Sequence, residues 1–305
     1  MQLIRTLQPT PSSEGACALA IGNFDGLHRG HQALIAAARA RAPDLQSALM
    51  CFEPLPATLF RPDRPVPRLM GVRDRLQACR QLGLDQVFML RFDRAFAALS
   101  PEAFVVEAVV KAARARVVVV GADFRFGARA AGDVALLAEL GQRHGFEVEV
   151  IAPVREHEEK VSSSRIRALL AGGELAAAAA LLGRPYRLSG RVLRGQQLGR
   201  RLGFPTVNLR PPQPPALAGV FAVRVSGSGF DRHPAVANLG RRPTVAGDGW
   251  LLEAHLFDWE GDLYGHHLDV EFVEWLRPEE KFASLDAMMV QMHDDAARAR
   301  AVLAP

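Results

Sequence analysis

The sequence predicts a chain of class α/β plus β, with a parallel sheet in its first part and a small antiparallel β-domain in its second. Up to about residue 185, strand-like apolar runs alternate with helical segments, a pattern typical of βαβ units. Beyond Gly183-Arg184-Pro185, short strand-like runs are separated by Gly, Pro and Asp, as in an antiparallel barrel or sandwich. A helical stretch over 284–303 closes the chain. We therefore expect domains at residues 1–185 and 186–305.

The first domain is predicted to be a Rossmann-like parallel sheet covered by helices. The four valines 117–120 show no alternation, as expected for a strand covered on both faces. Ser100 and Pro101 form a good helix start, with serine as the N-cap and proline at the first position. We expect strands over 16–21, 46–52, 87–90, 117–120 and 147–151, and helices over 32–42, 72–82, 101–114, 131–144 and 174–182.

The composition is that of a globular protein, with 49% hydrophobic and 23% charged residues among 305. No apolar run approaches the roughly 20 residues that span a bilayer, and residues 1–15 lack the apolar core of a signal peptide. The three cysteines are isolated in apolar or helical contexts, which favours reduced thiols. We therefore expect a cytoplasmic protein without a membrane partner.

The net charge of +4 does not indicate a nucleic-acid partner. The basic residues are scattered along the chain and are not interleaved with aromatic residues on one face. The same charge is compatible with small anionic substrates such as ATP. The sequence does not indicate an oligomeric state.

The ten residues 22–31, GNFDGLHRGH, stand between a predicted strand and a predicted helix. A helix N-terminus offers unpaired N–H groups and the positive end of a dipole, so it binds phosphate. Glycines let the backbone approach that phosphate, and His28 and His31 can donate hydrogen bonds to its oxygens. We therefore expect a site that cuts or moves a nucleotide phosphate. Its candidate binding residues in the turn are Gly22, Asn23, Asp25 and Gly26.

The turn also has two plainer interpretations. The histidines alone are compatible with polar caps in a tight strand-to-helix turn. His-x-x-His also supplies two zinc ligands, but no Cys or third His lies close by in the sequence, so a metal is not expected. The turn, with its H-x-G-H pattern, resembles the nucleotidylyltransferase signature, in which the histidines stabilise an α-phosphate under attack.

Two further segments of the first domain belong with this site. In 161–167, VSSSRIR, Ser163 and Ser164 can cap a helix or bind phosphate, and Arg167 can pair with phosphate bidentately. Alone, the segment predicts a serine-capped helix with surface arginines. Together with the turn, it resembles the S-S-T-x-x-R element that completes the triphosphate site of nucleotidylyltransferases. Asp123 follows the valine strand, at the edge where open α/β sheets bind ligands, and a simple turn is an equally good local interpretation.

The second domain carries a run of glycines, 195–208, GQQLGRRLGFPTVN. Gly195, Gly199 and Gly203, at four-residue intervals, indicate a loop that approaches phosphate with its backbone. Thr206 and Asn208 project to one side of an extended stretch, where their oxygens can hold Mg²⁺ and a nucleotide phosphate. A barrel strand after a flexible hairpin explains the same residues without chemistry.

The run resembles the riboflavin kinase signature, and the segments 238–244, 253–256, 262–265 and 276–282 agree with it in order. Together with the first domain, the chain from about residue 16 to 300 resembles the bifunctional bacterial riboflavin kinase/FAD synthetase family. It departs from the family in two places. Gln197 and Leu198 stand where the glycine loop of many members carries a basic residue, and Leu55 stands where many members have His.

The resemblance implies two ATP-dependent steps, an ATP:riboflavin 5′-phosphotransferase and an ATP:FMN adenylyltransferase. In the second domain, a small antiparallel barrel closed by the C-terminal helix, Glu253 is implied as general base for phosphorylation of riboflavin. Thr206 and Asn208 are implied to hold Mg²⁺ and phosphate, and Arg277 to meet the flavin. In the first, FMN attacks the α-phosphate of ATP to give FAD, with His28, His31 and Arg167 as catalytic residues.

Two other functions fit parts of the pattern. One is a nucleotidylyltransferase for another phosphorylated substrate, with a non-catalytic flavin-binding barrel. The other is a flavin-sensing protein that has lost its chemistry. The presence of both histidines and of Thr206, Asn208 and Glu253 argues against both alternatives.

Overall fold

The computed structural model describes residues 1–8, 15–41, 44–194, 199, 203–244 and 247–304. The chain divides into two compact units. The first unit joins Met1–Val66 and Val72–Ser162, and the second joins Pro67–Gly71 and Ser163–Pro305. The first unit is a parallel α/β structure and the second contains an antiparallel barrel, so the predicted fold class is confirmed.

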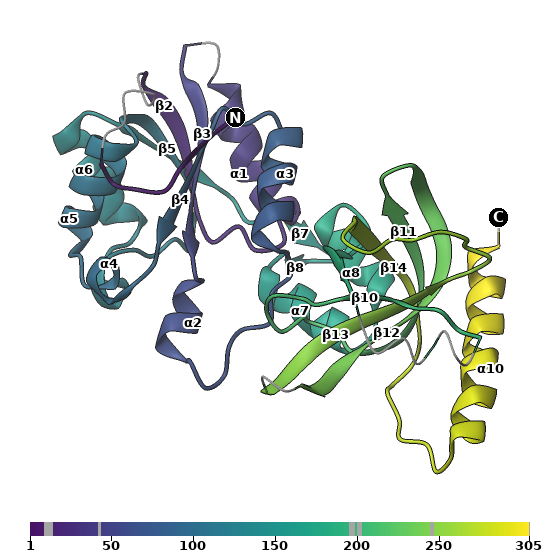
Figure 1. Cartoon of the computed structure of the whole chain (residues 1–305). Coiled ribbons are helices and arrows are strands. Elements are labelled where there is room, and N and C mark those ends of the chain that lie inside the picture. Colours follow the sequence, from purple (N-terminus) through teal and green to yellow (C-terminus); the bar gives the residue numbers. More distant parts are fainter. Residues whose placement is uncertain (9–14, 42–43, 195–198, 200–202, 245–246, 305) are drawn as a thin grey trace. The chain divides into compact units, whose positions relative to one another are not determined.

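The first unit is built on a parallel sheet of six strands in the order β1-β4-β3-β2-β5-β6 (Figure 1). The central strand β2 is buried at all five positions, as its unbroken apolar run predicts. Strand β1 has three residues and was not predicted, because so short a run carries no periodicity. The strands are β1 (Gln2–Ile4), β2 (Cys17–Ile21), β3 (Gln46–Glu53), β4 (Gln86–Arg91), β5 (Ala115–Gly121) and β6 (Glu147–Ile151).

Helices cover both faces of this sheet, with α1 (Arg29–Ala40) and α3 (Val72–Gln81) on one face and α5 (Pro101–Phe104) and α6 (Val134–His144) on the other (Figure 1). Ser100 is the N-cap of α5, as predicted, and its hydroxyl accepts from the Ala103 N–H at 3.1 Å. The helix predicted over 101–114 continues after α5 as a π-helix. The elements not named so far are this π-helix (Val105–Ala112), α2 (Pro56–Phe60), α4 (Arg94–Ala97), a 3₁₀ turn (Ala128–Ala130), β7 (Arg155–Glu156) and β8 (Glu159–Lys160).

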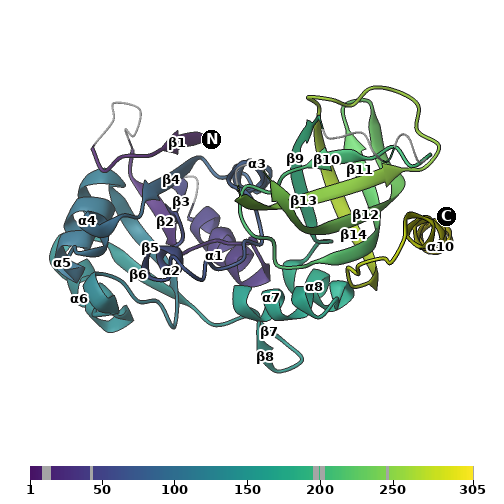
Figure 2. The same cartoon turned by 60° about the horizontal axis from the view of Figure 1, so that its bottom comes forward.

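The second unit is a closed antiparallel barrel in the strand order β10-β13-β12-β11-β14-β9, preceded by two helices (Figure 2). The sequence predicted a barrel or a sandwich from its short strands, and the closed strand order shows that they form a barrel. The elements are α7 (Ser163–Ala171), α8 (Leu175–Leu182), β9 (Arg187–Leu193), β10 (Val207–Leu209), β11 (Gly219–Gly227), β12 (Phe230–Thr244), β13 (Gly247–Leu256) and β14 (His267–Arg277).

The last helix, α10 (Leu285–Leu303), lies on the outside of the barrel wall (Figure 2). Inward residues of β11 such as Phe221 are fully buried, as a barrel core requires, but the alternate residues Val220 and Ala222 are buried too. These outward side chains pack with Ala299 and Leu303 of α10 in one apolar cluster. The helix therefore converts one side of the barrel's outer surface into a second core.

Candidate active sites

The predicted phosphate-binding turn leaves the first sheet where the strand order reverses. Strand β2 pairs with both β3 and β5, and the chain runs from β2 to β3 on one side and from β5 to β6 on the other. Open α/β sheets bind ligands at the carboxyl ends of the strands at such a switch point. The turn after β2 and the loop after β5, which carries Asp123, leave the sheet from these two neighbouring strands.

The turn holds a conformation that its buried side chains enforce. Phe24, Gly26 and Leu27 have φ of 50°, 85° and 43°, in the left-handed region that non-glycine residues rarely adopt. Phe24 and Leu27 are 0% and 1% exposed, so their packing stabilises this backbone. Strained backbone held by packing is typical of functional sites.

The two histidines of the turn stack on each other. Helix α1 begins at Arg29, earlier than the predicted residue 32, so His28 is its N-cap and its Nδ1 accepts from the His31 N–H at 3.3 Å. An accepting Nδ1 carries no proton, so the neutral ring carries its proton on Nε2. The rings lie 3.6 Å apart at 17°. A Cβ on Gly30 would lie 3.2 Å from the His28 ring, so glycine there leaves room for it.

Asp123 binds a residue that the sequence did not single out, Lys160. The Lys160 ammonium donates to the Asp123 carboxylate, and this hydrogen bond holds the pKa of Asp123 below its usual range. Lys160 ends β8, whose partner strand β7 carries Glu156, and Glu156 pairs with Arg29 at 2.8 Å. Ion pairs thus connect the β7–β8 hairpin both to α1, which follows the turn after β2, and to the loop after β5. The sequence offered one signal for Lys160, namely that lysine is rare in this arginine-rich chain.

The serine–arginine segment belongs to the second compact unit. Ser163 and Ser164 open α7, and the Arg167 Nε donates to the Pro67 carbonyl at 2.7 Å. Its participation in the adenylyl-transfer site stays a prediction.

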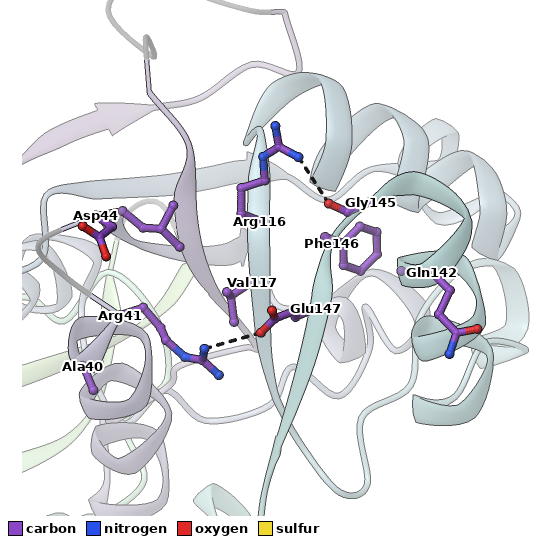
Figure 3. Close-up of a pocket in the computed structure, with 11 residues that line it drawn as sticks. Ala40, Arg41, Asp44, Arg116, Val117, Gln142, Gly145, Phe146 and Glu147 are labelled. Carbon is purple, nitrogen blue, oxygen red and sulfur yellow. Dashed lines mark hydrogen bonds and ion pairs between the residues drawn. The ribbon is translucent and has the colours of Figure 1, made fainter.

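The hollow drawn in Figure 3 lies at the opposite edge of the first sheet, where β5 and β6 begin. Arg41 pairs there with Glu147 at 3.4 Å and with Glu149 at 2.8 Å, and Arg116 donates to the Gly145 carbonyl at 3.5 Å. None of the predicted site residues lines this hollow. It is therefore not the site that the sequence predicts.

In the barrel, strand register aligns the predicted kinase residues. Asn208 of β10 pairs directly with Glu253 of β13, and Glu253 pairs with Asn238 of β12. Directly paired residues project to the same face of a sheet, so the three side chains form one row. Val236, two residues from Asn238, packs in the cluster under α10, which places the row on the outer face.

Asn238 was quoted in a motif but not predicted as a site residue. Its Oδ1 is buried and has no hydrogen-bond partner among the described residues. Buried polar atoms are almost always satisfied, so this oxygen is available to a bound molecule. Only the register, which the sequence does not give, reveals it.

The segment before β10 is held by two close contacts. The Phe204 N–H donates to the Gly199 carbonyl at 2.8 Å, and the His255 Nδ1 donates to the Pro205 carbonyl at 2.8 Å. His255 lies two residues after Glu253 on β13, and so on the same face. It therefore joins the strand of Glu253 to the peptide that leads into Thr206. Gly203 has φ of +78°, and Gly195 lies outside the described residues.

We expect Gly199→Ala to lower riboflavin phosphorylation strongly. The added Cβ would lie 2.2 Å from the Phe204 carbonyl oxygen and 3.5 Å from the Thr206 hydroxyl, so the segment must shift. A displacement of about 1 Å at a catalytic group lowers the rate about 10²-fold. Steady-state FMN formation measures this, with Gly172→Ala as control, because Gly172 also lies in the second unit but a Cβ added there makes only ordinary contacts of 3.6 Å. Equal losses in both variants would contradict the placement.

We expect His255→Ala to reduce FMN formation by up to about tenfold, the effect of one neutral hydrogen bond that holds Pro205. His255→Asn keeps a donor near the position of Nδ1 and should retain most of the activity. Both variants should convert supplied FMN to FAD normally. Loss in both variants alike would show that the ring's packing beside Phe204, at 4.9 Å, matters more than the hydrogen bond.

Arg277, the predicted flavin contact, is engaged by α10. Its Nε donates to Asp295 at 2.9 and 3.0 Å and its Nη2 at 2.7 Å, and Asp295 is 3% exposed. The Gln291 side chain also donates to Asp295 at 3.1 Å. This paired guanidinium ties the end of β14 to α10. A flavin contact at Arg277 stays a prediction.

A switch-point turn with stacked histidines in one unit, and a barrel that aligns a carboxylate with two amide side chains in the other, define an ATP-dependent transferase with two phosphate-transfer sites. The model of the FAD synthetase family matches residues 10–165, and the model of the riboflavin kinase family matches residues 182–303. The chain belongs to the bifunctional riboflavin kinase/FMN adenylyltransferase family and makes FMN and FAD. The alternative with a non-catalytic barrel is therefore set aside.

Similar proteins span almost the whole chain. The bifunctional riboflavin kinase/FMN adenylyltransferase of Escherichia coli strain K12 is 43% identical over 98% of this chain and 97% of its own length. That of Pseudomonas fluorescens is 43% identical over 100% and 99%. A crystal structure described as a macrolide-efflux protein from Streptococcus pneumoniae is 28% identical, with a TM-score of 0.79 over 98% of each chain. Within the described residues, no helix combines the length and apolarity of a membrane span.

Proposed function

We propose that riboflavin is phosphorylated on the outer face of the barrel, at Glu253, and that FMN is adenylylated at the turn between β2 and α1. The observation that carries the proposal is the register that aligns Asn208, Glu253 and Asn238 in one row, in a different unit from the stacked histidines. We also propose residue 185 as the boundary between the two catalytic domains. The two family models match residues 10–165 and 182–303, so the first match ends before residue 185 and the second begins close to it.

In the kinase reaction, Glu253 accepts the proton of the riboflavin 5′-hydroxyl as its oxygen attacks the γ-phosphorus of ATP. The bond from that phosphorus to the β-phosphate oxygen breaks, and ADP leaves. A positioned carboxylate contributes by general-base catalysis, while the rest of the rate comes from alignment and charge neutralisation. Gly199 and Gly203 give the nucleotide access to the backbone of the loop.

We propose Thr206 and Asn208 as ligands for Mg²⁺ bound with ATP. A hydroxyl and an amide oxygen are hard donors that suit Mg²⁺, which is commonly held by few protein groups together with phosphates and waters. When bound, the ion neutralises charge on the transferring phosphoryl group.

In the adenylyltransferase reaction, an FMN phosphate oxygen attacks the α-phosphorus of ATP, and pyrophosphate leaves. The nucleophile is already an anion, so the chain supplies positioning and hydrogen bonds. The Nε2–H of His28 and the ring of His31 donate to the α-phosphate at the N-terminus of α1. Ser163, Ser164 and Arg167 are proposed to bind the ATP phosphates, and Asp123 with the turn residues to shape the nucleotide site.

Labelled ATP tests which phosphorus is attacked in each reaction of the wild-type enzyme, while loss of the first reaction in Glu253→Gln and of the second in His31→Ala tests where each takes place. With riboflavin, Mg²⁺ and γ-labelled ATP, the label should appear in FMN and then in FAD. With unlabelled FMN and α-labelled ATP, it should appear in FAD alone, with unlabelled pyrophosphate released. FAD that carried no α-label would contradict adenylyl transfer, and unlabelled FMN in the first reaction would contradict phosphoryl transfer to riboflavin.

A further inference from the structure

Arg75, on α3, is a buried charge that the mechanism above does not use. Its side chain is 1% exposed, whereas arginine is almost never fully buried unless it is paired. Arg75 and Cys79 are the buried residues of α3, so the face of the helix that packs on the unit carries this guanidinium inward. A desolvated guanidinium must be compensated by the groups around it.

Those groups belong to the edge of the sheet where the phosphate-binding turn lies. The Arg75 Nη2 donates to the Glu53 carboxylate at 2.6 Å, and its Nη1 donates to the Asn23 carbonyl at 3.3 Å. Glu53 ends β3, and Asn23 lies in the turn after the neighbouring strand β2. One side chain thus joins the carboxyl ends of two adjacent strands at the turn.

The charges around Arg75 oppose the binding of a phosphate. Burial lowers the pKa of Arg75, but the carboxylates of Glu53 and Asp25 outweigh it, so the pKa lies above its usual value and the charge persists. Asp25 is itself 1% exposed. Without a neighbouring cation, two carboxylates at this turn would repel the polyphosphate that it is expected to bind.

We propose that Arg75 is a positioning residue of the adenylyltransferase site, which compensates Glu53 and Asp25 and holds the Asn23 carbonyl so that the turn accepts ATP. The proposal rests on the assignment of adenylyl transfer to this turn. It explains why a phosphate site contains a buried aspartate. A purely structural ion pair would explain the same contacts, so the test must separate charge from folding.

The test compares Arg75→Met with Arg80→Met, a control at an exposed arginine of the same helix. In the conversion of FMN to FAD, Arg75→Met should raise the KM for ATP by about tenfold or more, because an uncompensated charge acts on a highly charged ligand. The inhibition constant of adenosine, which carries no phosphate, should stay within about twofold of wild type. Riboflavin phosphorylation should not change in either variant.

Two more variants separate the effect of the Arg75 charge from an effect on folding. Arg75→Lys retains the charge and should keep the KM for ATP near wild type. If Arg75→Met does not fold, the double variant Arg75→Met/Glu53→Gln replaces it, because it removes both charges of the ion pair. Asp25 loses the interaction with Arg75 in this variant too, so the KM for ATP should still rise. An unchanged KM for ATP, or a parallel rise in the adenosine constant, would overturn the proposal. If His31→Ala left FAD formation intact, the assignment of the turn itself would be wrong, independently of Arg75.

Discussion

Replacing Glu253 with Gln is expected to lower FMN formation from riboflavin by roughly 10²–10⁴-fold, the usual contribution of a positioned general base. Glutamine keeps the size and hydrogen-bonding capacity of the side chain but cannot accept the proton of the 5′-hydroxyl. The register holds the residue between Asn208 and Asn238 in either case, so binding of riboflavin and ATP should change little. The effect should therefore fall on kcat, with KM nearly unchanged.

The same variant supplies its own folding control, because FMN added directly should be converted to FAD at the wild-type rate. Glu274→Gln is the matched variant, an exposed glutamate on β14 of the same barrel, and it should phosphorylate riboflavin normally. If Glu253→Gln kept more than about a tenth of the wild-type kcat, another group or bulk water would be the proton acceptor.

The fold was predictable where burial leaves a simple pattern. Strand β2 is apolar at every position because both of its faces are covered, and Ser100 followed by Pro101 signals a helix start that the structure confirms. The π-helix after α5 was not predictable, since its apolar spacing is also that of an ordinary helix. Barrel closure was not predictable either, because short strands pair in a barrel or a sandwich alike.

The site residues also divide into those that the sequence predicts and those that it does not. The turn was visible because three glycines, an aspartate and two histidines stand close together in the sequence. Lys160, His255 and Arg75 were missed because each is a single polar residue within an unremarkable segment. Their importance arises from distant partners, namely Asp123, the Pro205 carbonyl, and Glu53 with Asn23. Only the arrangement of strands, helices and loops in the fold brings these groups together.

Replacing His31 with Ala is expected to stop the pathway at FMN, with FAD formation reduced by about 10²–10³-fold, the usual effect of removing one donor to a developing charge. The loss should be at the upper end of this range, because the His31 ring also stacks on His28 at 3.6 Å and helps to orient it. Chromatography of reactions started from riboflavin should show FMN accumulating at the wild-type rate. His144→Gln, at the last residue of α6 in the same unit, should make FAD normally.

The chemical role of His31 can be separated from its mere presence by a third variant, His31→Asn. An amide donates a neutral hydrogen bond but cannot act as an acid or carry a positive charge. If the ring acts as a donor to the α-phosphate, Asn should restore about tenfold or more of the activity lost in Ala, in line with the strength of a charge-assisted hydrogen bond. Failure of Asn to recover any activity would instead point to proton transfer or to the positive charge of an imidazolium. Intact FAD formation in His31→Ala would remove the turn from the reaction altogether.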